Sequence, residues 1–92
     1  MPILNTRIAK YVEIKAENYN KIVLVMIGTY VCAYSDDAYT IAAALGLVVI
    51  GHPISLLENT VIAGFPIMQL PANKIKLNNM GYEILVLTDK DF

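Results

Sequence analysis

Three side chains that can bind or react occur at every second position of one short segment. They are Tyr30, Cys32 and Tyr34. Because residues two apart in a β-strand lie on the same face, these side chains would form a row across a sheet. Aromatic rings can stack on flat ligands such as nucleic-acid bases, whereas a thiol is only a weak hydrogen-bond donor and acceptor. Packing within the sheet is the commoner role of such a row, and the sequence leaves both roles open.

Enzymatic chemistry has few candidate residues in this chain. There is one histidine, His52 in a Gly-His-Pro turn, and one cysteine. A nucleophile requires a base within hydrogen-bond reach, a zinc site requires about four ligands, and a glycine-rich phosphate-binding motif is missing from the sequence. Asp36 and Asp37 have a structural role, since acidic residues at a helix start complement its dipole. We therefore predict a protein that is not an enzyme and binds neither a metal nor a cofactor.

The hydrophobic pattern predicts how helices and strands surround the row. Residues 22–27 form an aliphatic run typical of a buried strand, and Gly28-Thr29 separates it from the alternating segment 30–34. Ser35 can cap the next helix, as Thr6 can cap the first. The predicted order is α-β-β-α-β-β-α-β. Its elements are a helix at 6–17, strands at 22–27 and 30–34, a helix from about 36 to 45, strands at 47–50 and 60–65, a helix at 72–79 begun by Pro71 and ended by Gly81, and a strand at 83–87.

Length and composition favour one domain, spanning residues 1–92, that associates with itself. Hydrophobic residues make up 57% of the chain and charged residues only 16%, against a more usual proportion of about a quarter charged. Too few charges remain to cover the surface, so we expect an exposed apolar patch and a homo-oligomer, most simply a dimer. A single cysteine excludes an internal disulfide and fits a reducing, cytoplasmic compartment. The apolar stretch 41–57 is too short and too interrupted by Gly and Pro to predict a membrane span.

The basic residues are unevenly distributed along the chain. Several lie near its start, among them Arg7 and Lys10 on the polar side of the first helix, whereas the segment from Ile22 to Asn73 contains no Lys or Arg. Phosphate neutralisation supplies most sequence-independent affinity for nucleic acid, so we expect a Kd no tighter than about 10⁻⁴ to 10⁻⁶ M for duplex DNA at physiological salt. Arg7 and Lys10 are candidate phosphate contacts, although such residues more commonly solvate a helix face.

The chain also keeps a set of spaced sequence landmarks in a fixed order. They are Ile14-Lys15-Ala16, Gly28, Tyr34, Asp37-Ala38, Leu45-Gly46, Ala63-Gly64-Phe65-Pro66 and Gly81-Tyr82. This order resembles the N-terminal mismatch-recognition domain of MutS DNA-repair proteins over roughly residues 7–89. The resemblance implies an α+β fold with three helices and a single mixed β-sheet of about five strands. The clamp and ATPase domains of the full repair proteins do not fit within 92 residues, so we expect this domain to stand alone.

The resemblance assigns roles to two residues of the row. MutS proteins present a Phe-x-Glu motif after the first strand, in which the ring wedges beside a mismatched base and the carboxylate hydrogen-bonds to that base. The Phe position falls on Tyr30, which could still stack, and the Glu position falls on Cys32, which cannot replace a carboxylate. Met26 stands where the family commonly has a basic residue. We expect Cys32 to be buried, because its strand is apolar throughout.

Two functions follow, and the sequence leaves both open. The first is a MutS-like accessory module that contacts DNA, or an RNA and cDNA complex, weakly on its own. By family resemblance, its protein partner would be the reverse transcriptase of a diversity-generating retroelement. The second is a protein-interaction or self-assembly module that keeps the fold without binding nucleic acid. Tyr30 and the conserved order of landmarks favour the first, whereas the low charge and the missing glutamate favour the second.

Overall fold

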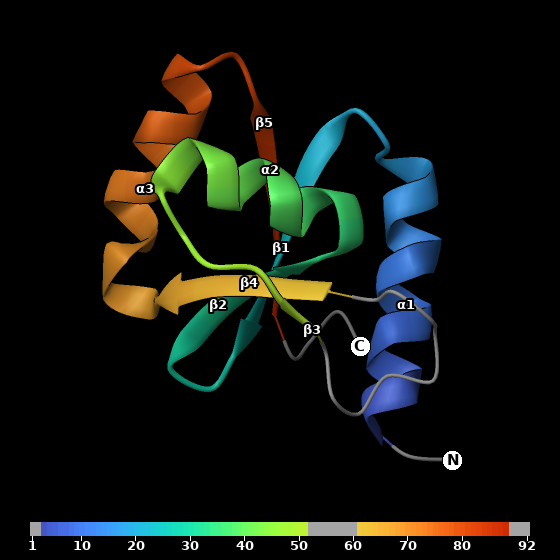
Figure 1. The fold of residues 1–92 in the computed structure, drawn as a ribbon. Coiled ribbons are helices and arrows are strands. Elements are labelled where there is room, and N and C mark those ends of the chain that lie inside the picture. Colours follow the sequence, from blue (N-terminus) through green and yellow to red (C-terminus); the bar gives the residue numbers. More distant parts are fainter. Residues whose placement is uncertain (1–2, 52–60, 89–92) are drawn as a thin grey trace.

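The fold is the α+β arrangement that the resemblance implies (Figure 1). A computed structural model describes residues 3–51 and 61–88, and residues 3–8 by their backbone alone. Apart from one added 3-10 helix, the described elements follow the predicted order. They are α1 (Ile3–Glu17), β1 (Lys21–Ile27), β2 (Tyr30–Tyr34), α2 (Ser35–Leu45), β3 (Ile50–Gly51), β4 (Val61–Pro66), the 3-10 helix η1 (Ile67–Gln69), α3 (Leu70–Asn79) and β5 (Glu83–Leu87).

The five described strands form one mixed sheet in the order β3-β4-β2-β1-β5. β2 is the central strand, and its neighbour β1 runs antiparallel to β2 but parallel to β5, which returns through α3. β2 also pairs with β4, which in turn pairs with the two residues of β3. The predicted fold class is therefore confirmed, with β2 in the middle of the sheet.

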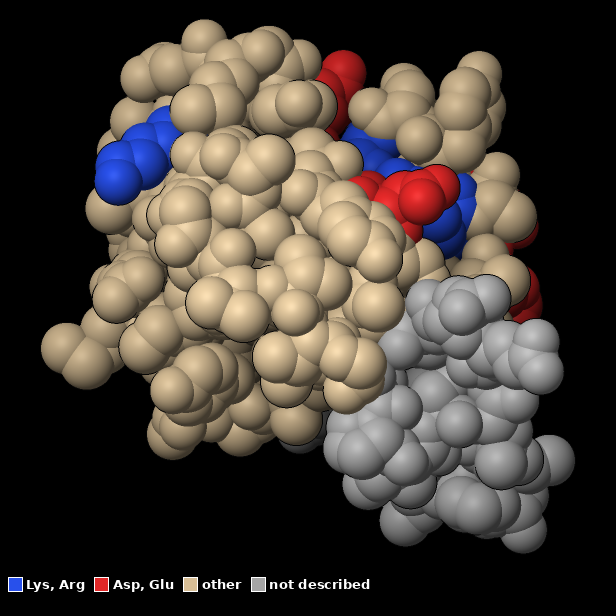
Figure 2. All heavy atoms as spheres, in the orientation of Figure 1, with Lys and Arg blue, Asp and Glu red and all other residues tan. Residues whose placement is uncertain are grey.

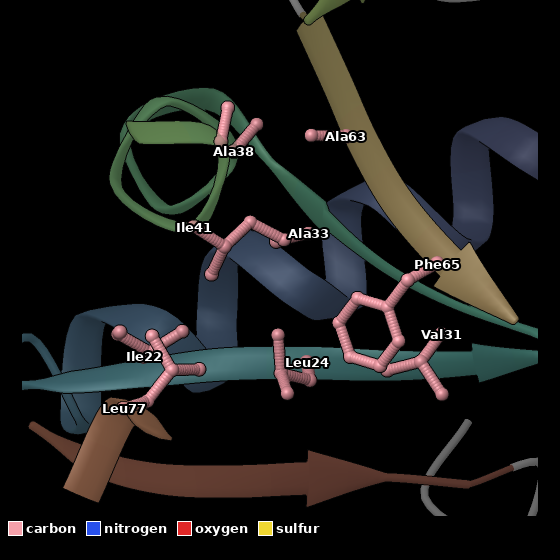
Figure 3. Packing of buried hydrophobic residues seen from close by; sticks show 10 residues of the cluster. Ile22, Leu24, Val31, Ala33, Ala38, Ile41, Ala63, Phe65 and Leu77 are labelled. Carbon is pink, nitrogen blue, oxygen red and sulfur yellow. The ribbon is translucent and has the colours of Figure 1, made fainter. Parts of the chain in front are cut away.

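The larger hydrophobic core lies between the sheet and helices α2 and α3. Every second residue of each strand faces it, because successive side chains of a strand point to opposite faces. Figure 3 shows Ile41 of α2 projecting toward Ala33 of β2, with Phe65 of β4 beside Val31. The buried members of this cluster are Ile22, Leu24, Val31, Ala33, Ala38, Ile41, Ala42, Ala63, Phe65 and Leu77.

A smaller core lies on the opposite face of the sheet, under α1. Tyr11 of α1 packs there against Val23, Val25, Tyr34 and Leu87. Among the described side chains, this cluster has half as many buried members as the larger one. The row of residues 30, 32 and 34 lies on this face of the sheet.

Two predicted helix caps are wrong. α1 begins at Ile3, so Thr6 lies inside the helix and does not cap it. α2 begins at Ser35, which follows β2 without a loop, and the residue before the helix is Tyr34, with an extended backbone and no side-chain cap bond. Ser35 has a φ of 54°, a left-handed conformation that side chains rarely adopt. The predicted acidic residues in the first turn are confirmed as Asp36 and Asp37.

The third strand differs most from its predicted bounds. Gly46 ends α2 in the left-handed conformation, and the N–H of Leu47 donates back to the carbonyl of Ala42 over 2.9 Å. That turn holds residues 47–49 out of the β4 ladder, so pairing begins only at Ile50. Gly81, with a φ of 95°, follows the end of α3 as predicted. His52 and the predicted start of β4 at residue 60 lie outside the described residues.

Candidate functional site

The turn between β1 and β2 presents the candidate stacking residue. Gly28 takes a φ of 60°, a conformation that glycine adopts readily, and this allows the two strands to pair directly on either side of Gly28-Thr29. Ile27 and Tyr30 form the first pair of the ladder. The side chain of Tyr30 is 51% exposed at this end of the sheet. Its aromatic ring is thus available to a ligand that approaches the turn.

The other two residues of the row are progressively more buried. Cys32 is 9% exposed, and Tyr34 lies in the smaller core. The ring of Tyr34 packs edge-on against Tyr11, with centroids 5.1 Å apart. An edge-on aromatic pair of this kind stabilises a core. Of the three candidates, only Tyr30 offers ring surface to a partner in this structure.

Cys32 is enclosed by the neighbouring strand. It pairs with Gly64, and a Cβ atom built on that glycine would lie 2.9 Å from the Cys32 sulfur and 2.8 Å from the carbonyl oxygen of Val31. The missing side chain at Gly64 therefore makes room for the thiol. Burial raises the pKa of Cys32, which keeps the thiol protonated. A longer, charged side chain has little room at this position.

A shallow hollow opens beside Tyr30, where residues 47–49 stay unpaired with β4. Its volume is about 220 Å³. We call it the Tyr30 hollow, and its lining residues are Tyr30, Cys32, Val48, Ile50, Ile62, Ala63 and Gly64. None of these side chains carries a charge at neutral pH, since the thiol stays protonated. The hollow is thus suited to an apolar or aromatic group rather than to a phosphate.

The basic candidate whose side chain is described, Lys10, lies away from this hollow. Lys10 belongs to α1, and none of the α1 side chains that the structure describes, residues 9–17, lines the hollow. Lys10 forms an ion pair with Glu13 at 3.8 Å in which both side chains are well exposed, a kind of contact that contributes little stability. The side chain of Arg7 lies outside what the structure describes. The structure therefore does not bring Lys10 together with Tyr30 and Cys32.

Sequence reasoning missed a buried polar network around Asp37. Its carboxylate accepts hydrogen bonds from the Tyr11 hydroxyl at 2.6 Å, the Lys15 ammonium at 2.9 Å and the backbone N–H of Val23 at 3.0 Å. Lys15 also donates to the carbonyl of Lys21. Burial and the neighbouring carboxylate raise the pKa of Tyr11.

This network ties α1, β1 and α2 together and explains two sequence landmarks. Lys15 belongs to the Ile14-Lys15-Ala16 landmark and Asp37 to Asp37-Ala38, which meet in space as an ion pair. An acidic residue that is buried needs a partner, so these two landmarks could have been matched in advance. Because Lys15 is occupied in this way, it adds little to any phosphate-binding surface.

Charged side chains are unevenly spread over the face of the molecule shown in Figure 2. Acidic and basic groups gather between α1 and the start of α2, a further basic group lies at α3, and the surface over α2 and β4 between them is free of charged groups. Within residues 3–51 and 61–88, no group of three or more His, Cys, Asp or Glu side chains is placed to hold a metal ion. No helix in the described part of the chain has the length and apolar character needed to cross a membrane.

A family model described as MutS domain I matches residues 6–91, which is nearly the whole chain. No curated protein matches the sequence.

Proposed function

The chain belongs to the MutS domain I family, and from that membership we propose that it is a non-catalytic module that contacts a DNA duplex through the β1–β2 turn. Tyr30 is the contact residue in this proposal. It would stack against a base beside a distorted or mismatched step, in the place where the family resemblance puts a phenylalanine. Inserting a side chain between base steps costs unstacking energy, which a kinked duplex offsets by meeting more protein surface.

One observation carries the proposal: the turn holds Tyr30 outward while its neighbours in the row are buried. A stacking residue must project from a rigid element, because a mobile ring would lose entropy on binding. Tyr30 meets that requirement, since it is the first residue of β2 and pairs with both Ile27 and Pro66.

This chain departs from the family motif, and these departures determine how its contact with DNA would differ from the contact that the motif makes. Cys32 offers no carboxylate to a base, and Met26 packs against the larger core where the family commonly has a basic residue. Stacking tolerates every base, whereas hydrogen bonds select among them. We therefore propose weak binding with little discrimination among mismatches.

If this chain by itself binds nucleic acid only weakly, a partner is needed to hold the nucleic acid. The reverse transcriptase suggested by the family resemblance, with its template RNA and cDNA, is the partner we propose. In such a complex the polymerase would supply the phosphate contacts, and this module would supply the stacking residue.

A titration of a labelled mismatched duplex at low salt tests the contact. Tyr30→Ala should raise the Kd by about 5- to 150-fold, which corresponds to about 1–3 kcal/mol of lost base stacking. Tyr39→Ala is the matched control, because Tyr39 is similarly exposed but lies on α2. Equal affinity for the wild type and Tyr30→Ala, or an equal loss in both variants, would refute Tyr30 as the contact.

A further inference from the structure

A second exposed apolar side chain lies at the same end of the sheet as Tyr30. Met68, the middle residue of η1, is 88% exposed, more than any other large hydrophobic residue that the structure describes. η1 directly follows β4, whose last residue, Pro66, pairs with Tyr30 at the start of β2. Met68 is thus two residues along the chain from the partner of Tyr30. Both side chains are open to a ligand that approaches this end of the sheet.

η1 is also fixed to the β1–β2 turn. The N–H of Ile67 donates a hydrogen bond of 2.8 Å to the carbonyl of Thr29, and Ile67 packs against the larger core. Residues bonded across strands have Cα atoms about 5.5 Å apart, and successive Cα atoms lie about 3.8 Å apart, so the backbone of Met68 lies within about 10 Å of the turn. The backbone that carries this exposed side chain is thus held in place beside Tyr30.

The charges around η1 suit a polyanionic ligand. Residues 22–34 and 61–73 contain no charged residue, and the first charges after η1 are Lys74 and Lys76 of α3. Both lysines are exposed, and neither forms an ion pair with a described residue. Carboxylates would repel the phosphates of nucleic acid, and neither η1 nor α3 contains one. A duplex held at Tyr30 would therefore meet no repulsion from these two helices.

We infer that Met68 is a second wedge that contacts the bases of the duplex beside Tyr30. The inference rests on the proposed function, because it adds a residue to the contact that Tyr30 makes. Methionine is among the apolar residues that insert between base steps and partly unstack them. Base steps along one strand are about 3.4 Å apart, so a side chain carried within about 10 Å of the turn reaches the same two or three steps as Tyr30.

Met68 would add affinity without selecting a base. Its thioether is only a weak hydrogen-bond acceptor, so it cannot replace the carboxylate that Cys32 lacks. The unbranched side chain is flexible and adapts to irregular surfaces, such as the edge of a distorted base step. This property agrees with the weak discrimination among mismatches proposed for Tyr30.

A titration of the chain, with isotope-labelled methionine methyl groups, by a mismatched duplex at low salt tests the inference. The methyl signal of Met68 should shift as duplex is added. Met68→Ala should raise the Kd about tenfold, because truncation removes the last three heavy atoms of the wedge and their apolar contact. Met80→Ala is the matched control, since Met80 is 55% exposed but follows the far end of α3. Its methyl signal and the Kd of its variant should stay unchanged.

Three outcomes would overturn the inference. They are a Met68 methyl signal that does not respond to duplex, a Kd that Met68→Ala leaves unchanged, and an equal loss of affinity in Met68→Ala and Met80→Ala. Thermal melts show whether the variants are folded, and Met68→Gln, which keeps the length of the side chain but is polar, replaces Met68→Ala if the latter unfolds.

The result is distinguishable from that of the proposed function. If Tyr30→Ala weakens binding and Met68→Ala does not, the proposed contact at Tyr30 stands and the wedge at Met68 is refuted. If Met68→Ala weakens binding and Tyr30→Ala does not, the contact at Tyr30 is refuted and Met68 remains a contact to the duplex.

Discussion

The hydroxyl of Tyr11 donates a hydrogen bond of 2.6 Å to the carboxylate of Asp37 and so joins α1 to the start of α2. Two further donors, the Lys15 ammonium and the Val23 N–H, complete the surroundings of that carboxylate. A buried carboxylate is tolerated only when it is paired in this way. The position of α1 against β1 and α2 depends on this network.

Neutralising Asp37 should destabilise the fold. Asp37→Asn leaves the half-buried Lys15 ammonium without its carboxylate, and breaking a buried ion pair typically costs about 3–5 kcal/mol. Asp36→Asn is the control, because Asp36 is the exposed neighbour in the same helical turn, and it should change stability by less than about 0.5 kcal/mol. Urea denaturation of the two variants measures both values, and equal small effects would contradict the role given to the network.

Stability should fall at alkaline pH through Tyr11. Burial and Asp37 raise the pKa of Tyr11 above its ordinary value of 10.0. Below that value the phenol is protonated in both the folded and the unfolded chain. Above it the unfolded chain loses the proton first, so the free energy of unfolding decreases as the pH rises. Thermal melts between pH 8 and 11 should show a steeper decline for the wild type than for Tyr11→Phe. Parallel declines would show that Tyr11 does not contribute.

Gly64→Ala, which adds a methyl group, should destabilise the fold. The new Cβ would meet the Val31 carbonyl oxygen at 2.8 Å and the Cys32 sulfur at 2.9 Å, so the strands must shift. Overpacking of this kind typically costs about 1–3 kcal/mol. Gly51→Ala is the control, since a Cβ there meets no atom within 4 Å. If Gly64→Ala melted at the wild-type temperature, the packing described between β2 and β4 would be wrong.

Cys32→Glu, which places the family's carboxylate at position 32, should not give the chain mismatch selectivity. Cys32→Glu would place a charge where the thiol is now enclosed, at a cost of several kcal/mol or with a raised pKa for the new carboxyl group. Thr29→Glu provides the comparison, because Thr29 is exposed in the adjacent turn. Thermal unfolding distinguishes the two. A Cys32→Glu variant with an unchanged melting temperature and new mismatch selectivity would mean that position 32 can face a base.

The sequence was sufficient to predict the elements whose signals are local. The aliphatic run of β1, the alternation of β2 and the Gly28-Thr29 turn gave the central hairpin, and Pro71 and Gly81 bounded the last helix. The third strand was misplaced because Leu47 to Ile50 has a strand-like composition. The bond from Leu47 back to Ala42, which follows from the helix end, keeps most of that segment out of the sheet.

The residues that arrange the site were harder to predict, since their partners lie far apart along the chain. The hydrogen bonds to Asp37 come from residues 14 to 26 positions earlier. The Tyr30 hollow likewise combines β2, β4 and the segment before β3, and no local pattern places these together. The exposure of Tyr30, by contrast, agrees with its place beside a tight turn.

The most direct test of the proposed function is a nuclear magnetic resonance titration of the labelled chain with a mismatched duplex at low salt. We predict that backbone shifts concentrate on residues 27–32 around Tyr30, because stacking of that ring on a base is the contact proposed for this chain. Shifts confined to α1 around Lys10, or none at duplex concentrations of about 1 mM, well above the weakest Kd expected for non-specific binding, would contradict the proposal that the β1–β2 turn contacts DNA.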